Sequence, residues 1–201
     1  ARRWITTRDG NASLRKTGSD TLYITPSGWR KSIIHPEHMI KIIMRDGELE
    51  IPQNTNPSGE LHMHHRLVEH AKTTRAVLHT HPTHIVAAMY AGFDLQKLAE
   101  QFPEIFRYTR VGPSVPAIPA TSRELGDATA EYMGLGQGHT GTAGSLKYDI
   151  VGQANHGVCA VAQDPWTAFE HVERLDHICE IVLKSGVTPA EVRTREPVAA
   201  A

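Results

Sequence analysis

The spacing of apolar and polar residues predicts short strands first and then a mixture of strands and helices. Apolar runs bounded by Gly, Pro and Asp are typical of strands. Such runs predict strands at residues 12–15, 22–25, 39–44, 76–80, 149–154 and 158–162. Apolar residues at helical spacing predict helices at residues 60–72, 83–91, 123–133 and 165–184.

Proline and glycine separate these elements. Pro113, Pro116 and Pro119 predict an extended, irregular passage, because proline fixes φ and lacks a backbone N–H. Five glycines within residues 134–144 predict a mobile loop. Gly186 is expected to end the last helix, and the tail after about residue 188 is expected to be loose.

The short spacing between the early strands decides the fold class. A parallel connection needs a crossover of roughly a dozen residues or more, and these strands are too close for that. We therefore expect an α/β protein with a mainly antiparallel or mixed central sheet and helices on both faces. The 201 residues fit a single domain spanning residues 1–201, with a sizeable core.

Composition excludes several classes of partner. A formal net charge of -1 offers no basic surface for nucleic acid or an anionic membrane, and no apolar run reaches the roughly 20 residues of a membrane span. The first seven residues lack the apolar stretch of a signal peptide. Cys159 and Cys179 stand in apolar sequence without metal spacing, so we expect buried thiols. A cytoplasmic protein is the expectation.

Thirteen histidines are an unusually high count for this chain, and two of them form a candidate metal pair. His79 and His81 lie two residues apart at the end of a predicted strand, so both side chains face one side and can share one divalent ion. Pro82 ends the strand and exposes its tip. His156, followed by Gly157, is the best candidate for the third ligand. Three neutral histidines with an open position are typical of a catalytic zinc.

Other histidines leave alternatives open. His84 follows the pair and could replace either ligand. Glu60, His64 and His65 lie about one turn apart on a predicted helix, with His62 beside them. Their order is not His-Glu-x-x-His, and a solvated helix face explains most of this cluster.

An ordered series of motifs resembles the class II aldolase/adducin family, typified by the fuculose-1-phosphate and rhamnulose-1-phosphate aldolases. Their order and spacing agree over most of the chain. The matching segments are Gly10-Asn11-Ala12-Ser13, Ile24-Thr25-Pro26-Ser27-Gly28, Pro57-Ser58-Gly59-Glu60, His79-Thr80-His81-Pro82 and Asn155-His156-Gly157. The resemblance implies the class II aldolase fold.

The resemblance also implies a role for each segment. His79, His81 and His156 would bind Zn²⁺ or another divalent transition metal, and Glu60 would be the acid/base at the start of its helix. A phosphate would be held by Gly10, Asn11, Ser27, Gly28, Ser58 and Gly59. Glycine turns, hydroxyls and a helix N-terminus suit an anion on physical grounds as well. Ser58 as a helix N-cap and Glu60 as an ordinary first-turn acid are the alternatives.

The implied function is that of a zinc-dependent aldolase. It would cleave a ketose 1-phosphate to dihydroxyacetone phosphate and an aldehyde, with the metal as the Lewis acid that stabilises an enediolate. Dehydratases of the methylthioribulose-1-phosphate type, decarboxylases and 4-epimerases share the scaffold and are alternatives, although related epimerases carry Asp where this chain has Glu60. A non-enzymatic adducin-like interaction module is a further alternative, but that class loses the ligand histidines.

The family also suggests how subunits would assemble. The resemblance implies a homotetramer with sites between subunits, in which a tyrosine of one subunit can donate to the aldehyde oxygen bound at the next. Tyr108 is the nearest candidate, although this chain is longer than the family pattern around residues 95–110. The helix that precedes the first motif in the family is absent or reduced here, and the glycine-rich loop at residues 134–144 has no family counterpart.

Overall fold

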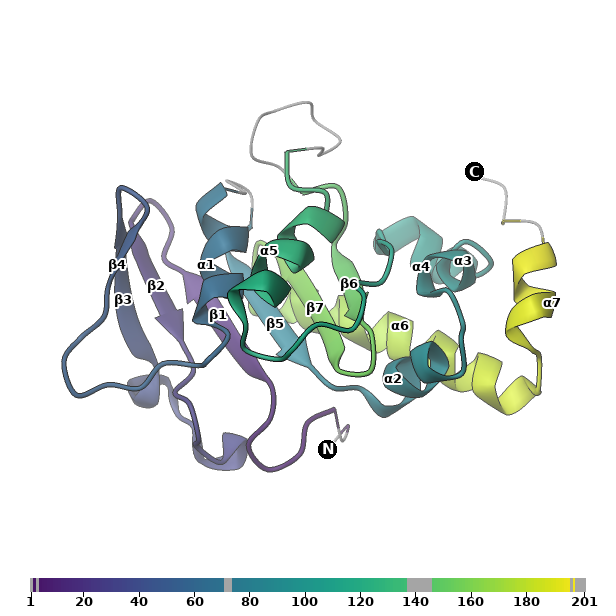
Figure 1. Ribbon diagram of the computed structural model, residues 1–201, viewed down its shortest axis with the longest axis horizontal. Coiled ribbons are helices and arrows are strands. Elements are labelled where there is room, and N and C mark those ends of the chain that lie inside the picture. Colours follow the sequence, from purple (N-terminus) through teal and green to yellow (C-terminus); the bar gives the residue numbers. More distant parts are fainter. Residues whose placement is uncertain (1, 3, 71–73, 137–145, 196, 198–201) are drawn as a thin grey trace.

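A seven-stranded sheet runs through the part of the chain that the structure describes, and neighbouring strands in it are antiparallel. The computed structural model describes residues 2, 4–70, 74–136, 146–195 and 197, arranged as in Figure 1. The sheet order is β4-β3-β2-β1-β5-β7-β6. The strands are β1 (Asn11–Arg15), β2 (Thr21–Ile24), β3 (Ile40–Arg45), β4 (Glu48–Glu50), β5 (Ala76–Thr80), β6 (Ile150–Gln153) and β7 (Gly157–Ala162). The expected sheet is confirmed in its antiparallel form.

Helices cover both faces of the sheet, as expected. On one face, α1 (Leu61–His70) and α5 (Arg123–Tyr132) pack against each other, with contacts to β5 and β6 respectively. On the other face, the long helix α6 (Pro165–Ser185) packs against β5, β7 and α2 (Thr83–Tyr90). The shorter helices are α3 (Leu95–Ala99), α4 (Pro103–Tyr108), α7 (Pro189–Thr194) and the 3₁₀ turns at Lys31–Ile33 and Pro36–His38.

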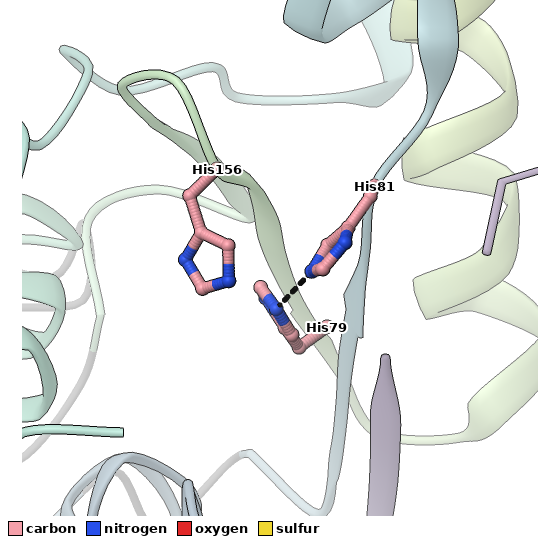
Figure 2. A group of neighbouring side chains, drawn as sticks. All are labelled: His79, His81 and His156. Atoms are coloured by element: carbon pink, nitrogen blue, oxygen red, sulfur yellow. Dashed lines mark hydrogen bonds between the residues drawn. The ribbon is translucent and has the colours of Figure 1, made fainter. Parts of the chain in front are cut away.

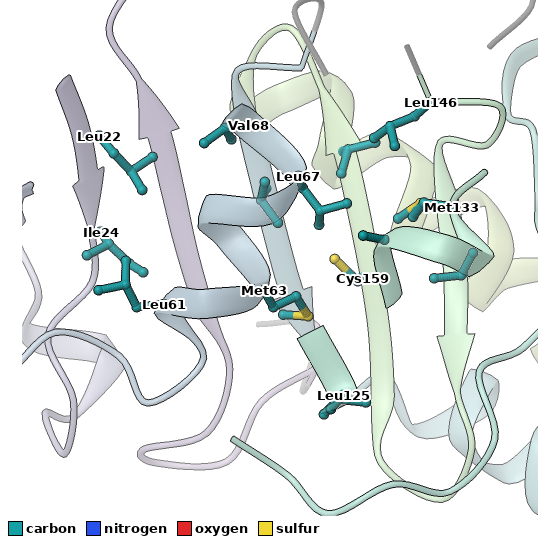
Figure 3. Packing of buried hydrophobic residues seen from close by; sticks show 14 of the residues in the cluster. Leu22, Ile24, Leu61, Met63, Leu67, Val68, Leu125, Met133, Leu146 and Cys159 are labelled. Atoms are coloured by element: carbon teal, nitrogen blue, oxygen red, sulfur yellow. The ribbon is translucent and has the colours of Figure 1, made fainter. Parts of the chain in front are cut away.

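Successive side chains of the central strands point to opposite faces of the sheet and pack into two separate hydrophobic cores. On β7, Cys159 and Val161 belong to the core beneath α1 and α5, whereas Val158 and Ala160 belong to the core beneath α6. Successive side chains of a strand point to opposite faces, so a strand covered by helices on both sides is apolar along its whole length. Figure 3 shows the first core, in which side chains of α1 and α5 meet those of the sheet.

The central strand β5 connects this core to the candidate site. Val77 belongs to the core beneath α1, and His79, two residues further on, points to the same face. In the strand register, Asn11 of β1 lies opposite His79 on one side and Cys159 of β7 lies opposite it on the other. The C-terminal end of β5 therefore lies beside the Gly10–Ser13 segment and beside the turn between β6 and β7.

Most of the predicted elements are present. Each predicted strand occurs with both ends within one residue of its expected position, and so does each predicted helix except the first, which begins at Leu61 and is described to His70. The proline passage is extended, and Val111 and Val115 form isolated parallel bridges to β6. Cys159 and Cys179 are free, buried thiols as expected, and burial raises the pKa of both.

Three features differ from expectation or lie outside the structure. The tail was expected to be loose after residue 188, but α7 forms there, because Thr188 and Glu191 cap each other's backbone and Val192 is buried. The edge strand β4 and the helices α3 and α4 were not predicted. Residues 137–145, most of the glycine-rich loop at 134–144, lie outside the described residues. Among the described helices, none is both long and apolar enough to cross a membrane.

Candidate metal centre

The first pair of candidate ligands lies at the open end of β5. His79 is 1% exposed, and its Nδ1–H donates to the carbonyl oxygen of Val158 on β7 at 2.9 Å. This bond sets the tautomer and leaves Nε2 available as a ligand atom. Nε2 of His79 lies 2.8 Å from Nε2 of His81, which is the first residue after the strand. Two imidazole nitrogens this close share either a proton or a metal ion.

The third histidine reaches the pair from the turn between β6 and β7. Asn155 has a left-handed φ of 58° in this turn. At the start of β7, a Cβ on Gly157 would collide with the carbonyl oxygen of Thr80. The rings of His79, His81 and His156 face one another in Figure 2, and one ligand atom from each lies within 4.8 Å of the others.

Burial and crowding keep the first two rings neutral. Desolvation, followed by the proximity of His81 and His156, lowers the pKa of His79 well below its ordinary value. Desolvation and His156 also lower the pKa of His81. Because a metal binds the neutral form of imidazole, a pair that resists protonation is suited to a divalent cation.

A buried carboxylate completes the cluster. Glu60 is 5% exposed and directly precedes α1. Its Oε2 accepts a hydrogen bond from Asn11 Nδ2 at 2.9 Å and lies 3.3 Å from His79 Nε2. Its Oε1 lies 3.9 Å from His156 Nε2 and has no hydrogen-bond partner among the described residues. A buried carboxylate oxygen without a partner, beside three imidazoles, fits a site for a divalent transition metal.

The cluster forms the floor of a pocket of about 220 Å³. Glu60 and the three histidines line it together with every residue proposed to hold the phosphate. These residues are Gly10, Asn11, Ser27, Gly28, Ser58 and Gly59. Gly10 and Gly28 have left-handed φ values of 72° and 73°, which glycine adopts without steric cost.

Two backbone hydrogen bonds join the loops on either side of the pocket. Ser27 N–H donates to the carbonyl oxygen of Asn56 at 2.8 Å, and Ser58 N–H donates to that of Thr25 at 3.1 Å. An isolated antiparallel bridge between Pro26 and Pro57 lies between them. Ser58 Oγ also accepts from Glu60 N–H at 3.3 Å, so the alternative in which Ser58 stabilises the start of the helix has a contact in its favour.

Five residues that line the pocket were missed in the sequence: Arg8, Asp9, Lys31, Ala120 and Thr121. Arg8 and Lys31 add positive charge to the lining, and Lys31 Nζ donates to the carbonyl oxygen of Arg8 at 2.7 Å. Desolvation lowers the pKa of Lys31, against the influence of Asp9. Thr121 has a left-handed φ of 63° and packs against Gly59.

The alternative histidines have other partners. His62 pairs with Asp127 at 3.0 Å, and His84 Nδ1 lies 3.3 Å from Asp176 Oδ2. Among the described residues, the only group of side chains placed to hold a metal is His79, His81 and His156. The rival metal cluster on α1 therefore has no support from the geometry.

Tyr108 does not join the pocket. It ends α4 and is 50% exposed, with the guanidinium groups of Arg107 and Arg174 at 5.3 and 5.4 Å from its ring centroid. The residues lining the pocket do not include it. A contribution from Tyr108 would therefore have to be made to the site of another subunit.

Comparison with known proteins identifies the family of this chain. The chain belongs to the family described as the Class II Aldolase and Adducin N-terminal domain, whose model matches residues 1–183. It is 24% identical over 180 residues to an L-fuculose phosphate aldolase from Methanococcus maripaludis, covering 90% of this chain and 87% of that protein.

Other relatives have different descriptions. A Nocardia farcinica protein named "probable bifunctional methylthioribose-1-phosphate isomerase/methylthioribulose-1-phosphate dehydratase" is 27% identical over 192 residues, covering 92% of this chain and 33% of that protein. The crystal structure of YgbL from Escherichia coli, described as "a putative aldolase/epimerase/decarboxylase", superposes with a TM-score of 0.75 at 22% identity. That match covers 96% of this chain and 89% of YgbL. This chain is therefore a member of the family with a candidate metal site formed by three histidines. The named relatives differ in the reaction that their descriptions give.

Proposed function

We propose that this protein is a metal-dependent aldolase that cleaves a ketose 1-phosphate into dihydroxyacetone phosphate and an aldehyde. The main support is that one pocket contains three histidines, a buried carboxylate and glycine and serine loops suited to an anion. One oxygen of this carboxylate has no hydrogen-bond partner among the described residues. The similarity to L-fuculose phosphate aldolases adds to this support.

His79, His81 and His156 would hold Zn²⁺ or another divalent transition metal. The metal would supply a Lewis acid that polarises the C2 carbonyl of the substrate and offsets negative charge as the C3–C4 bond breaks. The protein contributes the position of the ligands, because the strand end and the turn fix three rings around one point.

The loops around the pocket would bind the phosphate. The N–H groups of Ser27 and Ser58 already donate to carbonyl oxygens. The phosphate would therefore accept from the two serine hydroxyls and from the N–H groups of Gly28 and Gly59, which line the same pocket. Lys31 would add charge, and Gly10 and Asn11 would close the other side. An anchored phosphate would place the reacting carbons between the loops and the histidines.

Glu60 would transfer the proton. The electron pair of the broken C3–C4 bond stays on the dihydroxyacetone phosphate fragment, and Glu60 would return a proton to C3. The aldehyde fragment loses its hydroxyl proton to a second group. As in the family, we propose that this group comes from a neighbouring subunit of a homotetramer, with Tyr108 as the candidate.

The overall proposal is tested by a retro-aldol assay. Metal-loaded protein would be incubated with a panel of ketose 1-phosphates, with coupled detection of dihydroxyacetone phosphate, before and after removal of the metal with a chelator. We expect cleavage of at least one sugar, its loss on chelation and its return with Zn²⁺. If a fully loaded protein cleaves none of them, the aldolase proposal is wrong. The dehydratase named in the Nocardia farcinica relative then becomes the first reaction to assay.

Glu60→Gln is expected to keep the metal but lose turnover on the order of 10²-fold or more, since the amide cannot exchange a proton. Metal content by elemental analysis and kcat with the best substrate are the two measurements. Glu48→Gln, on the edge strand β4, is the matched control and should leave both unchanged. Normal turnover in Glu60→Gln would remove this residue from the mechanism.

A further inference from the structure

A chain of hydrogen bonds connects the interior of α1 with the carboxylate of Glu60. His64 lies one helical turn after Glu60 and is fully buried. Its Nδ1 lies 2.7 Å from Ser13 Oγ, and its Nε2 lies 2.5 Å from Asn11 Oδ1. Asn11 in turn donates through Nδ2 to Glu60 Oε2 at 2.9 Å. Ser13 and Asn11 are alternate residues of β1, so both face α1.

The direction of each hydrogen bond follows from the chemistry of these groups. The amide nitrogen of Asn11 faces a carboxylate, so it donates, and the amide oxygen faces His64, so it accepts. His64 must therefore carry its proton on Nε2. Its Nδ1 is then an acceptor, and the hydroxyl of Ser13 donates to it. Every link is satisfied with the His64 ring in its neutral form.

The surroundings of His64 favour that neutral state. Desolvation lowers the pKa of His64 to about 3, more than the nearby carboxylate of Glu60 raises it. A protonated ring would place a hydrogen on Nδ1 as well, and the hydroxyl of Ser13 would then have to reverse its hydrogen bond.

We propose that His64 is a positioning residue that holds the Asn11 amide with its NH₂ group toward Glu60, so that Oε1 of Glu60 is the oxygen that exchanges a proton with the substrate. This inference rests on the proposed function, because it names the working oxygen of the proposed acid/base. Oε2 is engaged by Asn11, whereas Oε1 has no partner among the described residues. Without His64, Oδ1 of Asn11 loses the donor that fixes the amide, so the amide can rotate and Nδ2 can leave Oε2 of Glu60.

Two variants of His64 separate positioning from packing. His64→Leu fills much of the space but removes both hydrogen bonds, whereas His64→Gln keeps an N–H donor for Asn11. We expect His64→Leu to lower kcat on the order of 10-fold, the worth of one well-placed hydrogen bond, with a smaller change in KM and unchanged metal content. His64→Gln should recover most of the loss. His62→Leu is the matched control and should leave kcat unchanged, because His62 faces α5 and pairs with Asp127 at 3.0 Å.

A double variant tests whether His64 acts through Asn11. If it does, adding His64→Leu to Asn11→Ala should cost little more in kcat than Asn11→Ala alone. Losses that multiply in the double variant would overturn the proposal, and so would equal losses in His64→Leu and His64→Gln.

Two measurements by NMR do not depend on any substrate. In metal-loaded protein labelled with ¹⁵N-histidine, His64 should show a protonated Nε2 and a bare Nδ1 near neutral pH. Any other tautomer would overturn the proposal. The side-chain NH₂ signals of Asn11 should shift in His64→Leu and keep their positions in His64→Gln, and unchanged signals in His64→Leu would also count against it. If these results are as expected but no sugar phosphate is cleaved, the proposed function fails while the assignment of His64 stands.

Discussion

Full burial makes His64 a pH-sensitive contributor to stability. Its pKa is about 3 in the folded chain against an ordinary value of 6.5. Between these values the unfolded chain binds a proton that the folded chain does not, so the free energy of unfolding falls as the pH falls through this window. Above pH 6.5 the contribution is fully present.

His64→Leu should therefore flatten the acid side of the stability curve. The slope lost well below pH 6.5 is expected to be about 1.4 kcal/mol per pH unit, the value for one proton. Urea unfolding of the wild type and the variant at a series of pH values measures this difference. Parallel curves would show that His64 takes up its proton at an ordinary pH in the folded protein.

Gly157 is a single residue on which the metal site depends. A Cβ there would collide with the carbonyl oxygen of Thr80 and come within 2.6 Å of His81 Cδ2. We expect Gly157→Ala to weaken metal binding at least 10-fold and to cost about 1–3 kcal/mol of unfolding free energy, as overpacking does. Metal titration and urea unfolding measure the two effects.

Gly186→Ala is the matched control for this prediction. Gly186 has a left-handed φ of 73° at the end of α6, and, its chain neighbours aside, no atom of the described residues lies within 4 Å of the position of its Cβ. Alanine there should destabilise the protein by about 1 kcal/mol through backbone strain while leaving metal affinity unchanged. Equal metal affinity in both variants would mean that the β6–β7 turn can move without disturbing His81.

At the scale of elements, α1 and α5 approach closely at Gly126. A Cβ at this position would lie 2.7 Å from His62 Cδ2 and 3.1 Å from the backbone N and Cα of Met63. Alanine normally stabilises a helix by about 1 kcal/mol relative to glycine. Here we expect Gly126→Ala to destabilise the protein by about 1–3 kcal/mol, because the two helices must separate. Denaturant unfolding measures the sign, and a stabilised variant would contradict the prediction.

The elements that the sequence predicted well are those with a strong apolar pattern. β5 and β7 are buried on both faces, and α6 carries a proline at its start and a glycine after its end, so their patterns are unambiguous. β4 has one apolar residue between two glutamates, and α3 and α4 are too short for helical periodicity to show. α7 was missed because its capping box follows a glycine that ends the preceding helix.

The candidate site was predictable to the extent that its residues stand in short motifs. His79 and His81 follow from the two-residue period of a strand, and the other pocket residues follow from the resemblance to a family. Lys31 and Thr121 reach the pocket through tertiary structure, which no local pattern reports. His64 was seen only as part of a rival cluster, because its partner Asn11 lies far away in sequence.

At the scale of the whole molecule, the exposed position of Tyr108 makes the proposed assembly testable. If Glu60 of one subunit and Tyr108 of the next serve one site, Glu60→Gln and Tyr108→Phe should each be nearly inactive, and mixed assemblies should regain activity. An equal mixture is expected to restore up to about a quarter of the sites, since both intact groups must meet by chance. Turnover after co-refolding measures this recovery.

The control for this experiment pairs two variants of one subunit's own site. Glu60→Gln and His156→Ala both alter groups that line the same pocket, so mixing them cannot create an intact site. This mixture should stay inactive. Recovery in neither mixture would place the aldehyde-side donor elsewhere than Tyr108.

The position of β5 between β1 and β7 also governs when the metal can be captured as the chain folds. Asn11, Glu60, His79 and His156 come from segments spread along the chain, and only the completed sheet brings them together. Such long-range pairings form late, because the entropy of closing large loops must be overcome first. A chain emerging from the ribosome can present the His79–His81 pair long before His156 is made. Tight metal capture at the proposed site would therefore follow completion of the sheet, so an ion bound there would stabilise the folded chain and would not nucleate its folding.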